Sequence, residues 1–173
     1  MKKILGIALG VLMALGAGSA FAQLPAETAS FTVEANVVGS CNFTAASGID
    51  FGSLDVPKAL IGTPIAQTGT LTILCTVGPD YKVALNNGLN FDVAAGRQMK
   101  GATDATKFIA YELYQDNSGT PARWGTGAEV EHLVADGTRQ VMTIYGKCPW
   151  NEGLLSSAPV QHYVDTVVAS YSF

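Results

Sequence analysis

The chain has few charged residues, few histidines and no cluster of basic side chains. Charged residues make up 14% of its 173 residues, against about a quarter in an average globular protein. Ten lysines and arginines stand against 14 aspartates and glutamates, so the formal net charge is −4. An acidic chain without a basic patch is poorly suited to bind nucleic acid or an anionic membrane surface. We therefore expect no nucleic-acid partner.

Motifs of catalysis and of cofactor binding are also missing. The two histidines, His132 and His162, have no partner at the spacing that metal ligands use. No nucleophile elbow, zinc-protease motif, phosphate-binding loop or dinucleotide fingerprint occurs. We predict that the protein is not an enzyme and has no catalytic residue, no metal site and no cofactor.

Long apolar runs are absent beyond the N-terminus, where residues 1–22 have the three parts of a secretory signal. Lys2 and Lys3 are followed by an apolar stretch over residues 4–15 and by an A-x-A cleavage site at residues 20–22. We expect export, with residues 1–22 as a signal peptide and residues 23–173 as a single domain of 151 residues. With 8 basic and 14 acidic residues left, its formal charge would be −6.

Cysteine is scarce, with three residues in the chain. In an oxidising compartment a disulfide is the default. Cys41 and Cys75 each lie beside a strand-like run, and we predict that they pair. Closing a loop of 34 residues is worth about 3 to 4 kcal/mol in the chain-entropy model. Cys148 is then either a small buried hydrophobic residue or a site of intermolecular pairing.

Short segments that alternate apolar and polar residues recur along the chain, separated by Gly, Pro and Asn turns. The predicted strands are residues 49–54, 69–75, 81–85, 97–99, 108–114, 140–145 and 163–173. Outside the signal no window has a helical period, and residues 103–107 form at most a turn. Seven or so short strands predict an all-β fold, an immunoglobulin-like β-sandwich.

The alternating segment a few residues past the predicted cleavage site is the most informative stretch. It places four apolar side chains on one face, namely Phe31, Val33, Ala35 and Val37. Such a strand, at about residues 28–38, can pair within its own domain or can be added to the sheet of a neighbouring subunit. At the other end, the alternation of residues 163–173 reaches the last residue, so we expect no downstream segment to complete the sheet.

The chain resembles the spore coat protein U domain, which is shared with subunits of archaic chaperone–usher pili. The matching pieces follow one another in this order: the alternating strand before Cys41, residues 49–52, 71–75, 81–85 with Gly88, Arg97 with Met99, 111–116, Trp124 with Gly125, and 163–173. Cys148 departs from the family pattern.

The resemblance implies a sandwich that lacks its last strand. A periplasmic chaperone first fills the gap, and at an outer-membrane usher the N-terminal strand of another copy or a related subunit replaces it. The chaperone-facing residues would be Val167, Ala169, Tyr171 and Phe173. The implied function is a structural subunit of a surface pilus or fimbria that supports adhesion or biofilm formation. Two alternatives are a spore or cell-surface coat protein of the same fold and a monomeric secreted carbohydrate-binding module.

Overall fold

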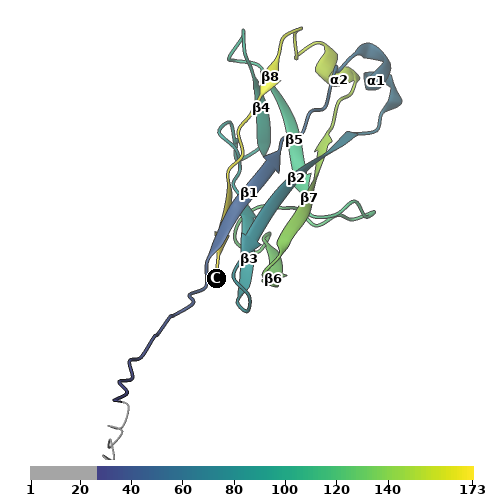
Figure 1. Ribbon diagram of the computed structural model, residues 1–173. Coiled ribbons are helices and arrows are strands. Elements are labelled where there is room, and N and C mark those ends of the chain that lie inside the picture. The colour runs from purple at the N-terminus through teal and green to yellow at the C-terminus, as the bar shows by residue number, and fades with distance from the viewer. Residues whose placement is uncertain (1–26) are drawn as a thin grey trace, which may run out of the picture. The chain divides into compact units, whose positions relative to one another are not determined.

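Nine strands and two short helices make up the part of the chain that the computed structural model describes, residues 27–173 (Figure 1). The strands are β1 (Cys41–Ser47), β2 (Ile65–Cys75), β3 (Asp80–Leu85), β4 (Arg97–Gly101), β5 (Phe108–Tyr114), β6 (Glu131–Val134), β7 (Arg139–Cys148), β8 (Tyr163–Val164) and β9 (Ala169–Ser172). The helices are α1 (Val56–Ile61) and α2 (Glu152–Leu155). The predicted signal peptide lies outside the described residues.

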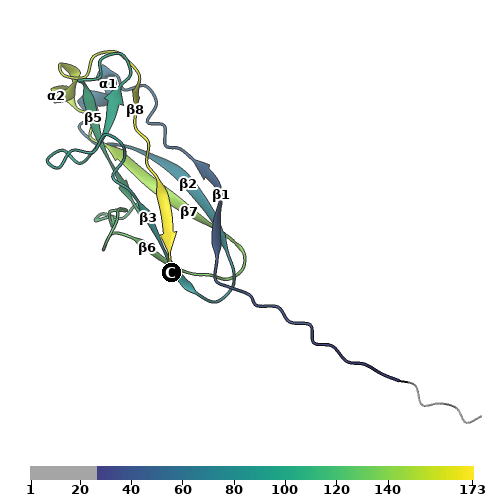
Figure 2. The same ribbon diagram turned by 90° about the vertical axis from the view of Figure 1, so that its left-hand side faces the viewer.

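The chain divides into two units after Asn36, and the second unit, Val37–Phe173, contains every one of these strands and helices. Its strands form a six-stranded sheet in the order β1-β2-β7-β5-β4-β8 and a three-stranded sheet in the order β6-β3-β9. All pairings between these strands are antiparallel. Both views place the helices and β8 at one end of this unit, and β6 and the C-terminus at the other (Figures 1 and 2).

The two sheets enclose one hydrophobic core, as the sequence predicts for a β-sandwich. Ile73 of β2, Val83 of β3 and Ile109 of β5 are buried almost completely, as is Trp124 in the loop after β5. Each fully buried aliphatic side chain stabilises the fold by about 1.5 to 3 kcal/mol. The strands predicted at residues 81–85, 97–99, 108–114 and 140–145 are confirmed as β3, β4, β5 and β7, and β2 contains residues 69–75.

The strand predicted at residues 49–54 is wrong, because this segment forms no strand. The Asp50 side chain accepts a hydrogen bond of 2.8 Å from the Gly52 N–H, and Gly52 has a φ of 66°, so the backbone turns there. Phe51 is nevertheless buried, and its ring would touch a Cβ on Gly146 of β7 at 3.1 Å. The apolar pattern therefore reflects packing across a sheet and not strand pairing.

The single strand predicted over residues 163–173 is also wrong, since this segment divides between the two sheets. β8 pairs with β4 in the larger sheet, and β9 pairs with β3 in the smaller one. Alternate residues from 163 to 169 stay half-buried across the crossover, so the pattern continues where the pairing changes. The prediction also missed β1 and β6, and it missed α1, which Asp55 caps by accepting a hydrogen bond from the Lys58 N–H.

The guanidinium of Arg97, fully buried on β4, ties the two sheets together. It donates hydrogen bonds to the carbonyl oxygens of Leu85 (3.2 Å) and Asn86 (2.7 Å), at the end of β3. It also donates to the carbonyl of Trp124 at 2.9 Å and forms an ion pair with Glu112 of β5. A buried charge is tolerated only when it is paired and its donors are satisfied, and this guanidinium meets both conditions.

The predicted disulfide is present: Cys41 of β1 and Cys75 of β2 are direct cross-strand partners and are bonded to each other. Cys148 is a free and completely buried thiol at the end of β7. Burial raises its pKa to about 11, so the thiol stays protonated at neutral pH. Of the two interpretations of Cys148, the structure agrees with the small buried hydrophobic residue.

Replacing both Cys41 and Cys75 by alanine should lower the free energy of unfolding by about 3 to 4 kcal/mol, because the unfolded chain loses a cross-link that closes a long loop. Urea unfolding measures this loss. Mass mapping of a non-reduced digest should find the Cys41–Cys75 bridge and an unreacted Cys148. A bridge from Cys148 to either residue would contradict the assignment.

Replacing Arg97 by methionine should lower the free energy of unfolding by about 3 to 5 kcal/mol, because Glu112 and three carbonyl oxygens lose their buried donor. Arg139→Met is the matched control, since Arg139 is exposed on β7 and should give a change within about 0.5 kcal/mol. Urea unfolding of both variants compares them. Equal stability of the two variants would show that the buried ion pair contributes nothing.

Candidate strand-acceptor site

Within residues 27–173 four strands lie at sheet edges, β1 and β8 in the larger sheet and β6 and β9 in the smaller one. Each has one edge that pairs with no other strand, and β1 and β9 are the two whose side chains meet. The rings of Phe43 on β1 and Tyr171 on β9 meet edge to face, with centroids 5.8 Å apart. The two edges, called the open edges below, therefore lie on the same side of the domain. An unpaired edge offers free N–H and C=O groups to an added strand.

The core-facing side of β9 is only partly covered. Tyr171 lies opposite Val83 of β3, and directly opposite residues project to the same face of a sheet. Val83 is completely buried, yet Tyr171 is 37% exposed and Phe173 is 56% exposed. The rings of Tyr171 and Phe173 also touch, with centroids 5.9 Å apart. Phe43, Tyr171 and Phe173, the aromatic cluster, thus form an apolar surface beside the open edges.

The four residues predicted to face a chaperone differ in their surroundings. Val167 and Ala169 are half-buried and pack against the core, whereas Tyr171 and Phe173 are exposed. Beside Phe173 lies an open pocket of about 250 Å³. The other residues that line it come from β3 and β6, namely Asp80, Tyr81, Lys82, His132, Leu133 and Val134.

The four predicted donor residues lie in a segment without strand pairing, since residues 27–40 form no helix or strand. Phe31, Val33 and Val37 are 87%, 82% and 83% exposed, and Ala35 is exposed as well. The four side chains that the sequence places on one apolar face are therefore all exposed in this structure. Isolated extended segments with such a face are suited to strand addition.

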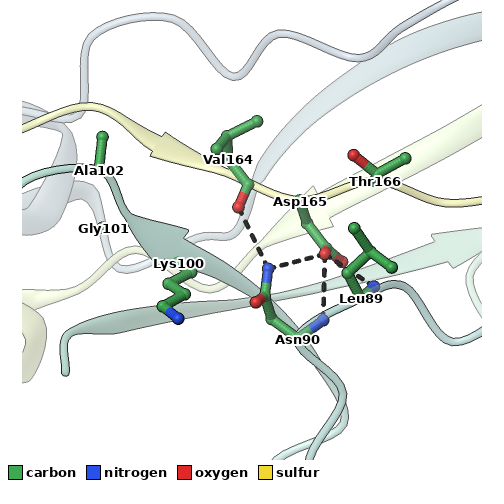
Figure 3. Close-up of a pocket in the computed structure, with 8 residues that line it drawn as sticks. All are labelled: Leu89, Asn90, Lys100, Gly101, Ala102, Val164, Asp165 and Thr166. Atoms are coloured by element: carbon green, nitrogen blue, oxygen red, sulfur yellow. Dashed lines mark hydrogen bonds between the residues drawn. The ribbon is translucent and has the colours of Figure 1, made fainter. Parts of the chain in front are cut away.

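Asp165 holds the crossover that leads into β9. Its Oδ1 accepts hydrogen bonds from the Leu89 N–H (3.0 Å), the Asn90 N–H (3.2 Å) and the Asn90 side-chain amide (2.9 Å), as Figure 3 shows. Its Oδ2 accepts a bond of 2.6 Å from the Tyr111 hydroxyl. Burial and this hydrogen bond raise the pKa of Tyr111 far above its ordinary value, so the hydroxyl remains a donor.

Asn86 fixes the next residues of the crossover. Its backbone N–H donates to the Val168 carbonyl, and its side-chain oxygen accepts from the Val168 N–H, both at 2.9 Å. Gly88 has a φ of 83°, and a Cβ there would lie 2.0 Å from the Asp165 carboxylate. Only glycine therefore allows the 86–90 loop to approach the crossover so closely. Together these contacts set where β9 begins.

The loop and the crossover border an open pocket of about 220 Å³ (Figure 3). Its lining consists of Leu89, Asn90, Lys100, Gly101, Ala102, Val164, Asp165 and Thr166. The Asp165 carboxylate already accepts four hydrogen bonds from the protein itself. The carboxylate at this pocket is therefore already used to hold the crossover that leads into β9.

The sequence did not predict that Arg97 and Glu112 form a buried ion pair, or that Asn86 and Asp165 hold the crossover into β9. The available signals were charges inside strand patterns, such as Glu112 within the apolar segment 108–114. In residues 27–173 no group of three or more His, Cys, Asp or Glu side chains is arranged to hold a metal ion. The same residues contain no helix with the length and apolar character to cross a membrane.

Comparison with known proteins agrees with this geometry. Residues 27–170 match the model of the Spore Coat Protein U domain family. No curated protein sequence matches the chain significantly. A similar fold occurs in a chain of the crystal structure of the CsuC–CsuE chaperone–tip adhesion subunit pre-assembly complex, from archaic chaperone–usher Csu pili of Acinetobacter baumannii.

The structural match has a TM-score of 0.54 at 24% sequence identity and covers 79% of the present chain. It covers 40% of the other chain, so the present protein spans less than half of that length. At this identity the likeness shows the fold. The family match extends over most of the chain, from residue 27 to residue 170, and the protein belongs to the Spore Coat Protein U domain family.

Proposed function

We propose that the protein is a structural subunit of a surface pilus or fimbria, assembled by the chaperone–usher route through donor-strand exchange. The observation that carries the proposal is the partly exposed core face of β9 next to an unpaired strand edge. In a complete sandwich another strand covers such a face. Here a strand from a second molecule would cover Tyr171 and Phe173 and would pair with the open edges.

The donor of that strand is the segment 28–38 of another copy. Its apolar face carries Phe31, Val33, Ala35 and Val37, and these side chains are exposed in their own chain. The register matters, because a shift by one residue would turn Glu34 and Asn36 toward the core instead. The proposal therefore requires that the apolar face points toward the aromatic cluster.

The energetics are consistent with a strand that binds both a core and an edge. Burying the four donor side chains contributes roughly 6 to 9 kcal/mol. Ordering about eight residues costs on the order of 8 to 16 kcal/mol of backbone entropy. Main-chain hydrogen bonds, at about 0.5 to 1.5 kcal/mol each, and the covering of Tyr171 and Phe173 offset the difference. Apolar burial alone would not hold the strand.

A periplasmic chaperone is the proposed first occupant of the open edges, and an outer-membrane usher the site of exchange. Support comes from the family and from the similar fold in a chaperone–subunit complex. An uncovered aromatic cluster beside unpaired edges invites aggregation, so a subunit in transit needs a temporary cover. The secretory signal predicted at residues 1–22 would bring the chain to the periplasm. Adhesion or biofilm formation would be the role of the finished fibre.

A coat protein of a spore or cell surface is the second candidate, because the matched family carries the description of a spore coat domain. Assembly by strand addition would serve either structure. Electron microscopy of the cell surface separates them, since a pilus projects as a filament and a coat forms a layer. Genes for a chaperone and an usher beside this one would favour the pilus.

Replacing Val33 by aspartate should abolish polymer formation while leaving export and chaperone binding intact. The variant would bury an unpaired carboxylate in the acceptor, which costs several kcal/mol, whereas Val33 is exposed in its own chain. Glu34→Gln is the matched control, because Glu34 lies on the opposite face. Polymer is measured as ladders in unboiled, non-reduced gels.

Normal ladders from Val33→Asp would place the donor strand elsewhere. A Val33→Asp subunit that cannot be recovered with its chaperone would assign the segment to its own core. A wild-type protein that stays monomeric without boiling would favour the carbohydrate-binding module instead of a polymer subunit.

Replacing both Tyr171 and Phe173 by serine should reduce recovery of the chaperone complex by at least about tenfold, because two aromatic side chains no longer contribute burial to the complex. Ser172→Thr is the control, since residue 172 points to the other side of β9. Co-purification from the periplasm measures the loss. Recovery of the double variant at the wild-type yield would show that the chaperone does not use this face.

A further inference from the structure

Hydrogen bonds to Thr76 hold the three residues that precede β1. The Ser40 N–H donates to the Thr76 hydroxyl oxygen at 2.9 Å, and the Thr76 N–H donates to the Ser40 carbonyl at 2.9 Å. The Thr76 hydroxyl in turn donates to the Val38 carbonyl, at 3.2 Å. Residues 38–40 are called the linker below. Val38 and Ser40, on either side of Gly39, are thus both hydrogen-bonded to Thr76, the residue that follows β2.

The linker is exposed, and two rings lie near it. A Cβ placed on Gly39 would be in ordinary contact with the Pro79 ring at 3.4 Å and with the Phe173 ring at 4.0 Å. Directly after the linker, the disulfide from Cys41 to Cys75 joins β1 to β2. Residues 38–41, which follow Val37, are therefore held by one disulfide and three hydrogen bonds.

The linker is short. Three extended residues span at most about 10 Å. If the donor strand, about residues 28–38, is inserted in another copy, its last residue, Val38, is the first residue of the linker, so that copy has to lie within about this distance of Thr76. The Thr76 hydroxyl then sits at the joint between two consecutive subunits, and no long tether separates them.

We propose that Thr76 is a positioning residue for this joint: its hydroxyl holds the linker so that the donor strand leaves the domain at a set point and in a set direction. The partner is a second copy of this chain, and the inference rests on the proposed strand exchange. A held linker makes the joint stiff, whereas a free one would let consecutive subunits swivel.

Thr76→Val tests the hydroxyl, because valine has nearly the same shape and cannot donate or accept. Thr76→Ser is the control, since it keeps the hydroxyl. Hydrogen exchange of the Ser40 amide, measured on the mature protein, should become about tenfold faster in Thr76→Val. It should stay at the wild-type rate in Thr76→Ser.

Electron microscopy of the assembled fibres provides the second readout. The persistence length of Thr76→Val fibres should fall by about half or more, because the loss of two hydrogen bonds frees the linker. Thr76→Ser fibres should match the wild type. If Thr76→Val destabilised the whole domain, the yield of fibres would fall, whereas the persistence length of the fibres that form would not change.

Fibres of Thr76→Val with the wild-type persistence length would overturn the inference while leaving strand exchange intact. Unchanged exchange of the Ser40 amide would overturn it as well, independently of any fibre. A wild-type protein that forms no fibre would instead refute the proposed function, and with it the joint.

Discussion

One buried guanidinium carries the connection between the two sheets. Arg97 starts β4 in the larger sheet and donates to the carbonyl oxygens at the end of β3 in the smaller one. Glu112 balances its charge and is itself paired with Arg123 at 2.6 Å. Removing any one partner would leave a charge or a carbonyl oxygen in the core without a partner. The relation of β3 to the larger sheet depends on this arrangement, and β9 depends on β3.

The position of β9 follows from a second set of polar contacts. Asp165 and Asn86 hold the crossover on both sides, so the chain leaves the larger sheet at β8 and joins the smaller sheet at β9. The strand arrives beside β3 with its outer edge unpaired and two aromatic rings partly bare. The open edges are thus a consequence of how the polar supports place the last strand.

The aromatic cluster and the linker lie near each other in the second unit. A Cβ on Gly39 of the linker would lie 4.0 Å from the Phe173 ring. Cys41 joins this region to β2 through the disulfide. In the proposed assembly, this short linker would join the folded body to the strand that it lends. In the proposed fibre, the contacts of Thr76 would lie at the joint between consecutive subunits.

Local alternation and cysteine spacing were enough to predict the all-β fold, five of the strands and the disulfide between Cys41 and Cys75, because these features depend on neighbouring residues. The order of family motifs identified the family. The apolar faces of residues 31–37 and 163–173 were also readable, since a period of two shows which side chains share a face.

Only the tertiary structure decided which strands pair and where the edges stay open. Residues 163–173 show one alternating pattern, yet they divide between two sheets, because Asp165 and Asn86 form hydrogen bonds with partners 75 and 82 residues away. The roles of Arg97 and Thr76 could not be predicted for the same reason: their hydrogen-bond partners, the Trp124 and Val38 carbonyls, are set by folding. A sequence pattern records the face on which a side chain lies, and the long-range hydrogen bonds that choose its neighbour exist only once the chain has folded.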